Sequence, residues 1–270
     1  MSEGHSPGAA QLLPQALASA HTSGRLVRMS LAWFGLMLTL TLVSRILPAA
    51  VATDESGQGT ALFSLLCFGA YDLVFCLLGS LLISGVLGCA MGAIAGLFDG
   101  WVDRAMRRLF EVFGALPSVI LAVVLAAASP HRTYPLVLAL GLTRWVEIAR
   151  LVRVQVRQAR AQDYVTAARA LGLSRWAVLR LHIAPNAAGP VVVALSFSAS
   201  GLVALRMLVG FVLPQATSHW NWGASLRLWQ HGDSLLAFAF PALFLIATQL
   251  SQSTVAEGLR RALDSSDKAR

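Results

Sequence analysis

An all-α integral membrane protein with about six transmembrane helices is the fold class that this sequence predicts, and three observations support it. Of the 270 residues, 56% are hydrophobic and only 13% are charged. The mean hydropathy is +0.66, well above that of an average soluble domain. Several apolar runs are long enough to span a bilayer. Because no strand-like alternation recurs along the chain, these runs are expected to be helices.

Six apolar runs match a hydrocarbon thickness of about 30 Å. They occupy residues 30–48, 73–98, 109–128, 134–149, 191–213 and 235–254. Pro117 is expected to kink the third run, and Gly92 and Gly96 are expected to let another helix approach the second closely. Residues 1–28 lack an apolar period and are expected to form a flexible cytoplasmic tail. The alternative is a signal peptide that is cleaved after the first run.

The 21 Lys and Arg residues predict the orientation. Most of them flank the apolar runs on the side of the N-terminus, whereas Arg45, Arg132 and Arg227 fall on the other side. Cytoplasmic loops carry the excess of positive charge in membrane proteins, so both termini are expected in the cytoplasm. The net charge of +8 is spread over several inner loops, and it therefore calls for no nucleic-acid partner.

One polar segment, residues 163–190, interrupts the apolar chain and predicts a two-helix knob on the cytoplasmic side. Asp163 is expected to cap the first short helix, which carries Ala167 and Ala168. Gly172 is expected to end this helix in the left-handed conformation that glycine adopts without strain.

The second helix of the knob is predicted to run over residues 175–183, with Ser174 as its N-terminal cap. Trp176 and Leu179 share one face of this helix, and Pro185 is expected to end it. Two helices of this length are too small to fold alone. We therefore expect a cytoplasmic partner to grip the knob.

The wording of the segment, D-Y-V-x-A-A-R-A-L-G…R-L-H-I-A-P-N-A-x-G-P, resembles the EAA loop of ABC importer permeases, in their dipeptide, oligopeptide and nickel branch. The resemblance covers about residues 68–263. It implies a type I importer permease of MetI-like architecture. The implied domains are a first transmembrane helix with a short outer loop at 29–70, a permease domain at 71–261 with a cytoplasmic coupling loop at 150–190, and a cytoplasmic tail at 262–270.

The same resemblance implies the contacts with an ATPase. The residues concerned are Asp163, Thr166, Ala167, Ala168, Gly172, Arg175, Pro185 and Asn186, and Thr166 stands where the family commonly has Glu. The implied partners are a second permease subunit, two ABC ATPase subunits that use ATP and Mg, an extracytoplasmic substrate-binding protein and membrane lipid. The chain has no GxxxxGK[ST] loop, so we expect it to bind no cofactor and to be no enzyme. Its scattered His and Cys residues predict no metal site.

The fifth apolar run departs from the family. The family usually shows Glu-Ala-Ser-Leu-Ser-Phe-Leu-Gly there, whereas this chain has Arg206 and Met207. A charge at membrane depth is costly unless it faces a cavity or a partner, so Arg206 is a candidate for the translocation path. The adjacent Met207 is a further candidate. The alternative for Arg206 is an ion pair with Glu147 or Glu111. Arg144 and Glu147 stand three apart and are expected to form a local ion pair, and both are further path candidates.

These features predict a permease subunit that moves di- or oligopeptides by alternating access, powered by ATP. Uptake of nickel or of an opine-type metal complex is the alternative within the same architecture. An alternative of another class is a secondary transporter that uses Arg144, Glu147 and Arg206 as a relay, although such folds usually show internal repeats or broken spans.

Overall fold

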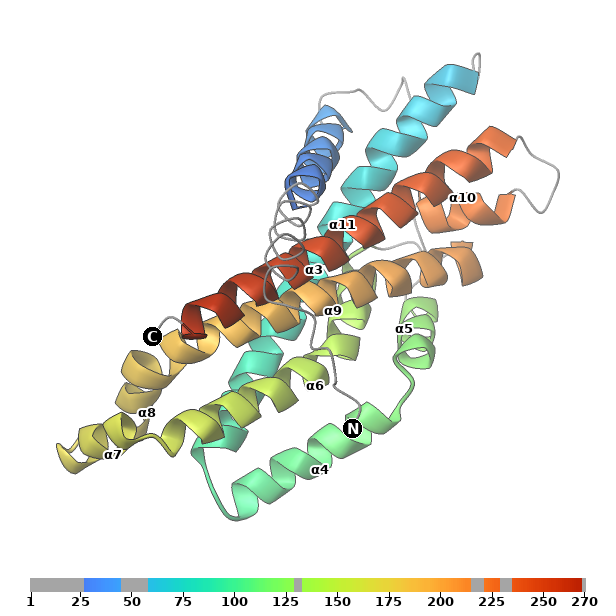
Figure 1. The fold of residues 1–270 in the computed structure, drawn as a ribbon. Helices are drawn as coiled ribbons and strands as arrows, with labels where there is room; N and C mark the ends of the chain where they lie inside the picture. The colour runs from blue at the N-terminus through green and yellow to red at the C-terminus, as the bar shows by residue number, and fades with distance from the viewer. Residues whose placement is uncertain (1–26, 45–57, 129–132, 215–220, 229–234, 269–270) are drawn as a thin grey trace, which may run out of the picture.

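The computed structural model describes residues 27–44, 58–128, 133–214, 221–228 and 235–268, and helices make up nearly all of them (Figure 1). Within these ranges, four helices are long and apolar enough to cross a membrane. They are Val27–Ser44, Phe63–Leu97, Arg175–Val212 and Phe238–Arg261. The all-α prediction is confirmed. Most of the predicted N-terminal tail and of the first outer loop lies outside the described residues.

Two long helices, α3 (Gln58–Leu97) and α6 (Thr133–Arg160), pack against each other along their length. Gly88 of α3 faces Ile148 of α6. A Cβ atom on Gly88 would lie 2.6 Å from the Cβ atom of Ile148, so glycine is needed for this close approach. Gly96 lies two turns after Gly88 on α3, and it faces Val156, which lies two turns after Ile148 on α6. The two helices therefore run parallel.

A parallel pair requires the chain to return between α3 and α6. The return consists of α4 (Trp101–Ala115) and α5 (Ser118–Ala127), whose axes are bent by 77°. The prediction of one helix over 109–128 was therefore wrong. Pro117 biases Leu116 toward the extended conformation that it adopts and has no amide hydrogen for a helical bond, so the helix breaks instead of kinking.

α6 differs from the four apolar helices because it carries Arg144, Glu147 and Arg150 in its middle turns. Its 28 residues span about 42 Å, and its packing along α3 places it in the same layer. By length and composition, four of the described helices can cross a membrane, or five if the bent α4–α5 pair is one span, so the structure supports four or five of the six predicted spans. The second predicted run, residues 73–98, begins earlier than expected, because α3 starts at Gln58.

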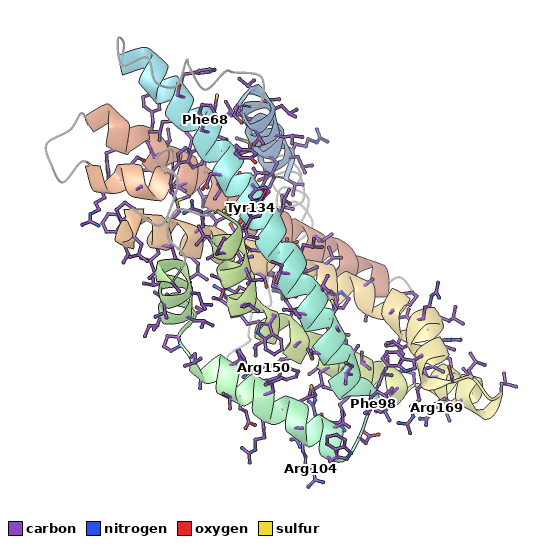
Figure 2. The ribbon with its side chains drawn as sticks, turned by 180° about the vertical axis from the view of Figure 1, so that it is seen from behind. Phe68, Phe98, Arg104, Tyr134, Arg150 and Arg169 are labelled. Atoms are coloured by element: carbon purple, nitrogen blue, oxygen red, sulfur yellow. The ribbon has the colours of Figure 1, made fainter. Side chains whose placement is uncertain are left out.

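The second half of the chain folds back over the first (Figures 1 and 2). It comprises α9 (Ala184–Val212), α10 (Trp222–Leu228) and α11 (Leu235–Lys268), and α9 lies beside α11, α6, α10 and α3. Trp222 is 1% exposed and donates a hydrogen bond of 3.0 Å from its indole nitrogen to the carbonyl of Leu65. Trp33 of the first helix donates one of 3.1 Å to the Thr248 hydroxyl of α11.

Candidate functional site

The knob lies between α6 and α9. It consists of α7 (Asp163–Ala170), α8 (Arg175–Val178) and a π-helical turn (Leu179–Ile183) that leads directly into α9. In Figure 2, Arg169 of the knob lies at the same end of the molecule as Phe98 and Arg104, whereas Phe68 lies at the opposite end. The knob therefore shares one end of the bundle with the connection between α3 and α4.

The first helix of the knob forms as predicted, but its cap differs. The N-cap residue is Gln162, whose side chain makes no capping bond. Asp163 is the first residue of the helix, where its carboxylate stabilises the helix dipole instead of capping an amide, so the cap prediction was wrong. Gly172 has φ +89°, which confirms the left-handed conformation. A Cβ atom at Gly172 would meet no atom within 4 Å, so the requirement for glycine is purely conformational.

One face of α7 packs into this chain and the other faces outward. Val165 and Ala168 are buried, at 0% and 7% exposure, in a cluster with Leu97, Val156 and Val178. Ala168 therefore does not present its side chain to a partner, which corrects its place among the predicted contacts. The other residues of that set on α7, which are Asp163, Thr166 and Ala167, are exposed.

The second half of the knob begins as predicted and ends differently. The Ser174 hydroxyl accepts a hydrogen bond of 3.2 Å from the amide of Ala177, which confirms the cap. The helix does not end at Pro185, because it continues through the π turn into α9. Proline lacks the amide hydrogen that a helix interior needs, and here the wider turn precedes it, so Pro185 falls in the first turn of the next helical stretch. The prediction for Pro185 was wrong.

Asn186 joins the knob to the first turn of α9. Its side-chain nitrogen donates to the Tyr164 hydroxyl of α7 at 3.1 Å and to the His182 carbonyl at 2.9 Å. The Tyr164 and His182 rings stack with centroids 6.3 Å apart. Asn186 was predicted as a contact to the ATPase, and in the structure its side chain holds α7 against α9.

A network of ion pairs holds the root of the knob. Asp103 at the start of α4 receives hydrogen bonds from Arg153 at 2.6 and 3.0 Å and from Arg157 at 3.0 Å, both on α6. Arg107 lies 3.5 Å from the same carboxylate. Because the side chain of Asp103 is only 7% exposed, these bonds fix the α3–α4 connection to the end of α6.

Asp99 extends the network. Arg160 donates to its carboxylate at 2.7 Å and to the carbonyl of Gly96 at 2.7 Å. The hydrogen bond from Arg160 lowers the pKa of Asp99, and the charge of Arg157 acts in the same direction. In the sequence these arginines indicated only orientation. The missed signal was their spacing, because Arg153, Arg157 and Arg160 fall on one face of a helix.

Arg206 forms a buried ion pair with Asp72 of α3, whereas the alternative prediction named Glu147 or Glu111 as its partner. The Arg206 side chain is 2% exposed and that of Asp72 is 9% exposed. The Nε and Nη1 atoms of Arg206 have no hydrogen-bond partner in the part of the chain that the structure describes. The missed signal was Asp72 itself, an acid in an apolar helix that requires a partner.

Two other predicted path residues, Arg144 and Glu147, pair with each other. The Arg144 Nη1 atom donates to both carboxylate oxygens of Glu147 at 2.7 and 2.9 Å, which confirms their local ion pair. Glu111 pairs with Arg108 at 2.8 Å. Met207 follows Arg206 on α9 and is half-buried. Three of the four predicted path residues therefore belong to two separate ion pairs, Arg206 with Asp72 and Arg144 with Glu147.

Long apolar helices that carry a basic two-helix knob at one end define a helical membrane protein, and the described residues contain no catalytic constellation. Residues 88–266 match the family model of the binding-protein-dependent transport system inner membrane component. The match covers more than half of the chain, and the chain belongs to this family. The predicted membership of the ABC importer permeases is confirmed, and it argues against the secondary-transporter alternative.

Several relatives carry transport names. The chain is 29% identical over 222 residues to the oligopeptide transport system permease protein OppC of Bacillus subtilis (strain 168), which covers 78% of this chain and 70% of the relative. It is 28% identical over 232 residues to the probable D,D-dipeptide transport system permease protein DdpC of Escherichia coli (strain K12), with 83% and 77% covered.

One solved structure shares the fold. It is a chain of the methionine ABC transporter MetNI in an inward-facing conformation, with a TM-score of 0.61 over 74% of this chain and 97% of that chain. The sequence identity is 17%, so the likeness supports the MetI-like fold alone. The fold prediction is confirmed.

Proposed function

We propose that this chain is the permease subunit of an ATP-driven importer that moves di- or oligopeptides across the inner membrane. The knob is the observation that carries the proposal, because a rigid, basic, outward-facing element at the end of a helix bundle is suited to docking. The chain has no nucleotide-binding loop. Two separate ABC ATPase subunits would therefore bind ATP and Mg and hydrolyse the nucleotide.

The knob acts as a lever in this proposal. Asn186 ties α7 to α9, and Asp103 ties the end of α6 to the α3–α4 connection. When the ATPase moves the knob, these contacts make α6 and α9 move with it. A two-state change of this kind, biased by nucleotide on one side and cargo on the other, produces alternating access.

The remaining partners complete the path. A second, similar permease encloses the route with this chain, and an extracytoplasmic binding protein delivers the cargo. With the knob in the cytoplasm, the parallel course of α3 and α6 supports a cytoplasmic location for both termini, in agreement with the positions of the arginines. Membrane lipid surrounds the apolar helices.

The names of the relatives support a peptide cargo, since they include transport proteins for oligopeptides and for D,D-dipeptides. A nickel or metal–chelator cargo is the alternative in the same architecture. The deciding experiment is reconstitution of this chain in vesicles with the permease, ATPase and binding protein encoded beside it. We expect tripeptides to stimulate ATP hydrolysis and to accumulate in the vesicles. Stimulation by a nickel complex and not by any peptide would overturn the peptide assignment.

A further inference from the structure

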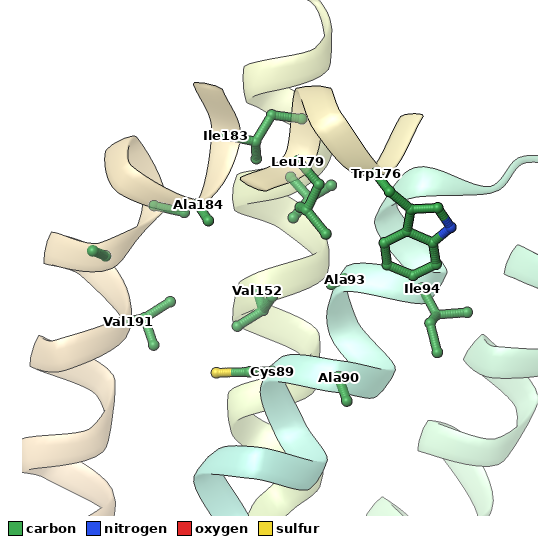
Figure 3. Close-up of a pocket in the computed structure, with 13 residues that line it drawn as sticks. Cys89, Ala90, Ala93, Ile94, Val152, Trp176, Leu179, Ile183, Ala184 and Val191 are labelled. Carbon is green, nitrogen blue, oxygen red and sulfur yellow. The ribbon is translucent and has the colours of Figure 1, made fainter. Parts of the chain in front are cut away.

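An apolar cavity of about 430 Å³ lies beneath the second half of the knob (Figure 3). Four elements build it: α3 supplies Cys89 and Ala93, α6 supplies Val152, the knob supplies Trp176 and Leu179, and α9 supplies Val191. All 13 lining side chains are uncharged, and all but the thiol of Cys89 and the indole of Trp176 are hydrocarbon. Figure 3 shows the Cys89 side chain extending from α3 toward α9, beneath Leu179 and Ile183.

The position of the cavity along α3 and α9 indicates which kind of molecule can reach it. Its α3 wall, residues 89–94, belongs to the last turns of the apolar helix that ends at Leu97. Its α9 wall, residues 184–191, belongs to the first turns of the next apolar helix. The cavity therefore lies at the level of the edge of the hydrocarbon layer, where the acyl chains of one leaflet begin. Water gains little in so apolar a space because it finds no hydrogen-bond partners.

Uncompensated positive charge lies beside the cavity. The guanidinium of Arg175 lies 5.5 Å from the centre of the Phe98 ring, and that ring lies 6.3 Å from Trp176 of the cavity wall. Arg175, Arg169 and Arg180 have no carboxylate within ion-pair distance among the described residues, whereas the arginines at the end of α6 are paired with Asp99 and Asp103. An anion can therefore approach Arg175 without competing with an acid of this chain.

We propose that the cavity binds an anionic phospholipid of the cytoplasmic leaflet. One acyl chain fills the space between α3, α6 and α9, and the phosphate lies at Arg175 beside Phe98 and Trp176. Charge complementarity favours an anionic lipid over a neutral one, because each arginine near a membrane surface favours an anionic head group. This lipid is bound at a defined position under the knob, in addition to the lipid that surrounds any membrane protein.

The test measures lipids that stay bound to the purified full chain. The protein is placed in nanodiscs of phosphatidylcholine and phosphatidylglycerol, extracted with mild detergent and analysed by native mass spectrometry. Ala93→Phe fills the cavity, and Ala115→Phe adds the same ring at an exposed site of α4. Arg175→Gln removes the charge, and Arg104→Gln removes an exposed arginine of α4.

We expect the wild type to retain phosphatidylglycerol in preference to phosphatidylcholine. Ala93→Phe should lose most of the bound lipid, and Arg175→Gln should lower the preference for phosphatidylglycerol about fivefold. Both control variants should behave as the wild type. Equal retention of the two lipids by the wild type, or unchanged retention in Ala93→Phe, would overturn the proposal.

A second measurement needs no cavity-filling variant. Cys67 and Cys76 are 1% and 0% exposed, and in a chain with both replaced by alanine the remaining thiol is Cys89 in the cavity wall. We expect phosphatidylglycerol to slow the reaction of Cys89 with a maleimide more than phosphatidylcholine does. Glycerol phosphate, which has the anion without the acyl chains, should leave the rate unchanged. Equal protection by both lipids, or protection by glycerol phosphate, would contradict the proposal.

Discussion

The buried pair of Asp72 and Arg206 gives the sharpest prediction on stability. Only 9% and 2% of the two side chains are exposed, and two nitrogens of Arg206 already have no partner among the described residues. Asp72→Ala would leave a full positive charge buried without compensation. We expect it to lower the free energy of unfolding by about 3–5 kcal/mol, the usual cost of removing one partner of a buried ion pair.

The double variant Asp72→Ala/Arg206→Met separates the charge from the packing. Because both charges are removed and the methionine side chain replaces the aliphatic part of the arginine, stability should return to within about 1 kcal/mol of the wild type. The cycle of single and double variants isolates the coupling between the two residues. Glu111→Gln is the control, since it breaks an exposed pair on α4 and should cost less than about 1 kcal/mol.

The assay combines denaturant unfolding of the purified chain with its abundance in membranes and with peptide uptake. A stable Asp72→Ala variant, or a double variant as unstable as the single one, would refute the reasoning. Uptake by the double variant decides the predicted role of Arg206 in the path. If the double variant is stable and transports normally, Arg206 serves the fold and contacts no cargo.

Three further variants test local features of the fold. Gly172→Val should cost about 1–2 kcal/mol because of the positive φ and should lower ATPase co-purification and uptake, while membrane abundance stays normal; normal uptake would show that the cap does not matter. Gly92→Val should reduce membrane abundance strongly, since its Cβ would lie 2.5 Å from the Ala149 carbonyl oxygen of α6, whereas Gly35→Val meets no atom within 4 Å and should be tolerated. Asp103→Asn, which removes the carboxylate shared by Arg107, Arg153 and Arg157, should lower the thermal unfolding midpoint more than Asp99→Asn, whose side chain is 60% exposed; equal shifts would contradict the network.

The knob could be predicted in detail because its rules are local. Ser174 caps an amide three residues away, and glycine is required at position 172 because of the positive φ of that residue. Both depend on a few neighbouring residues, and the sequence contains all of them. Pro185 was misjudged for the opposite reason, because its effect depends on the π turn before it, and that turn is set by packing against α3 and α6.

The ion pairs between helices could not be predicted in the same way. The sequence identified Arg206 as unusual but offered Glu147 and Glu111 as partners, since both lie in apolar or amphipathic runs. Arg206 pairs with Asp72 because of the register between α3 and α9, and a local sequence pattern does not predict that register. The burial of Ala168 depends in the same way on how α7 rests on the end of the bundle.

Two adjacent alanines of α7 test most directly whether the outer face of the knob is the docking surface of the ATPase. Ala167 is exposed and Ala168 is buried in this chain. The measurement is co-purification of the ATPase subunit with Ala167→Asp, beside the thermal stability of the variant. We predict that Ala167→Asp keeps the stability of the wild type and loses the ATPase, whereas Ala168→Asp loses stability because it buries an unpaired charge. Normal retention of the ATPase by Ala167→Asp, and by a lysine at the same position, would contradict the account.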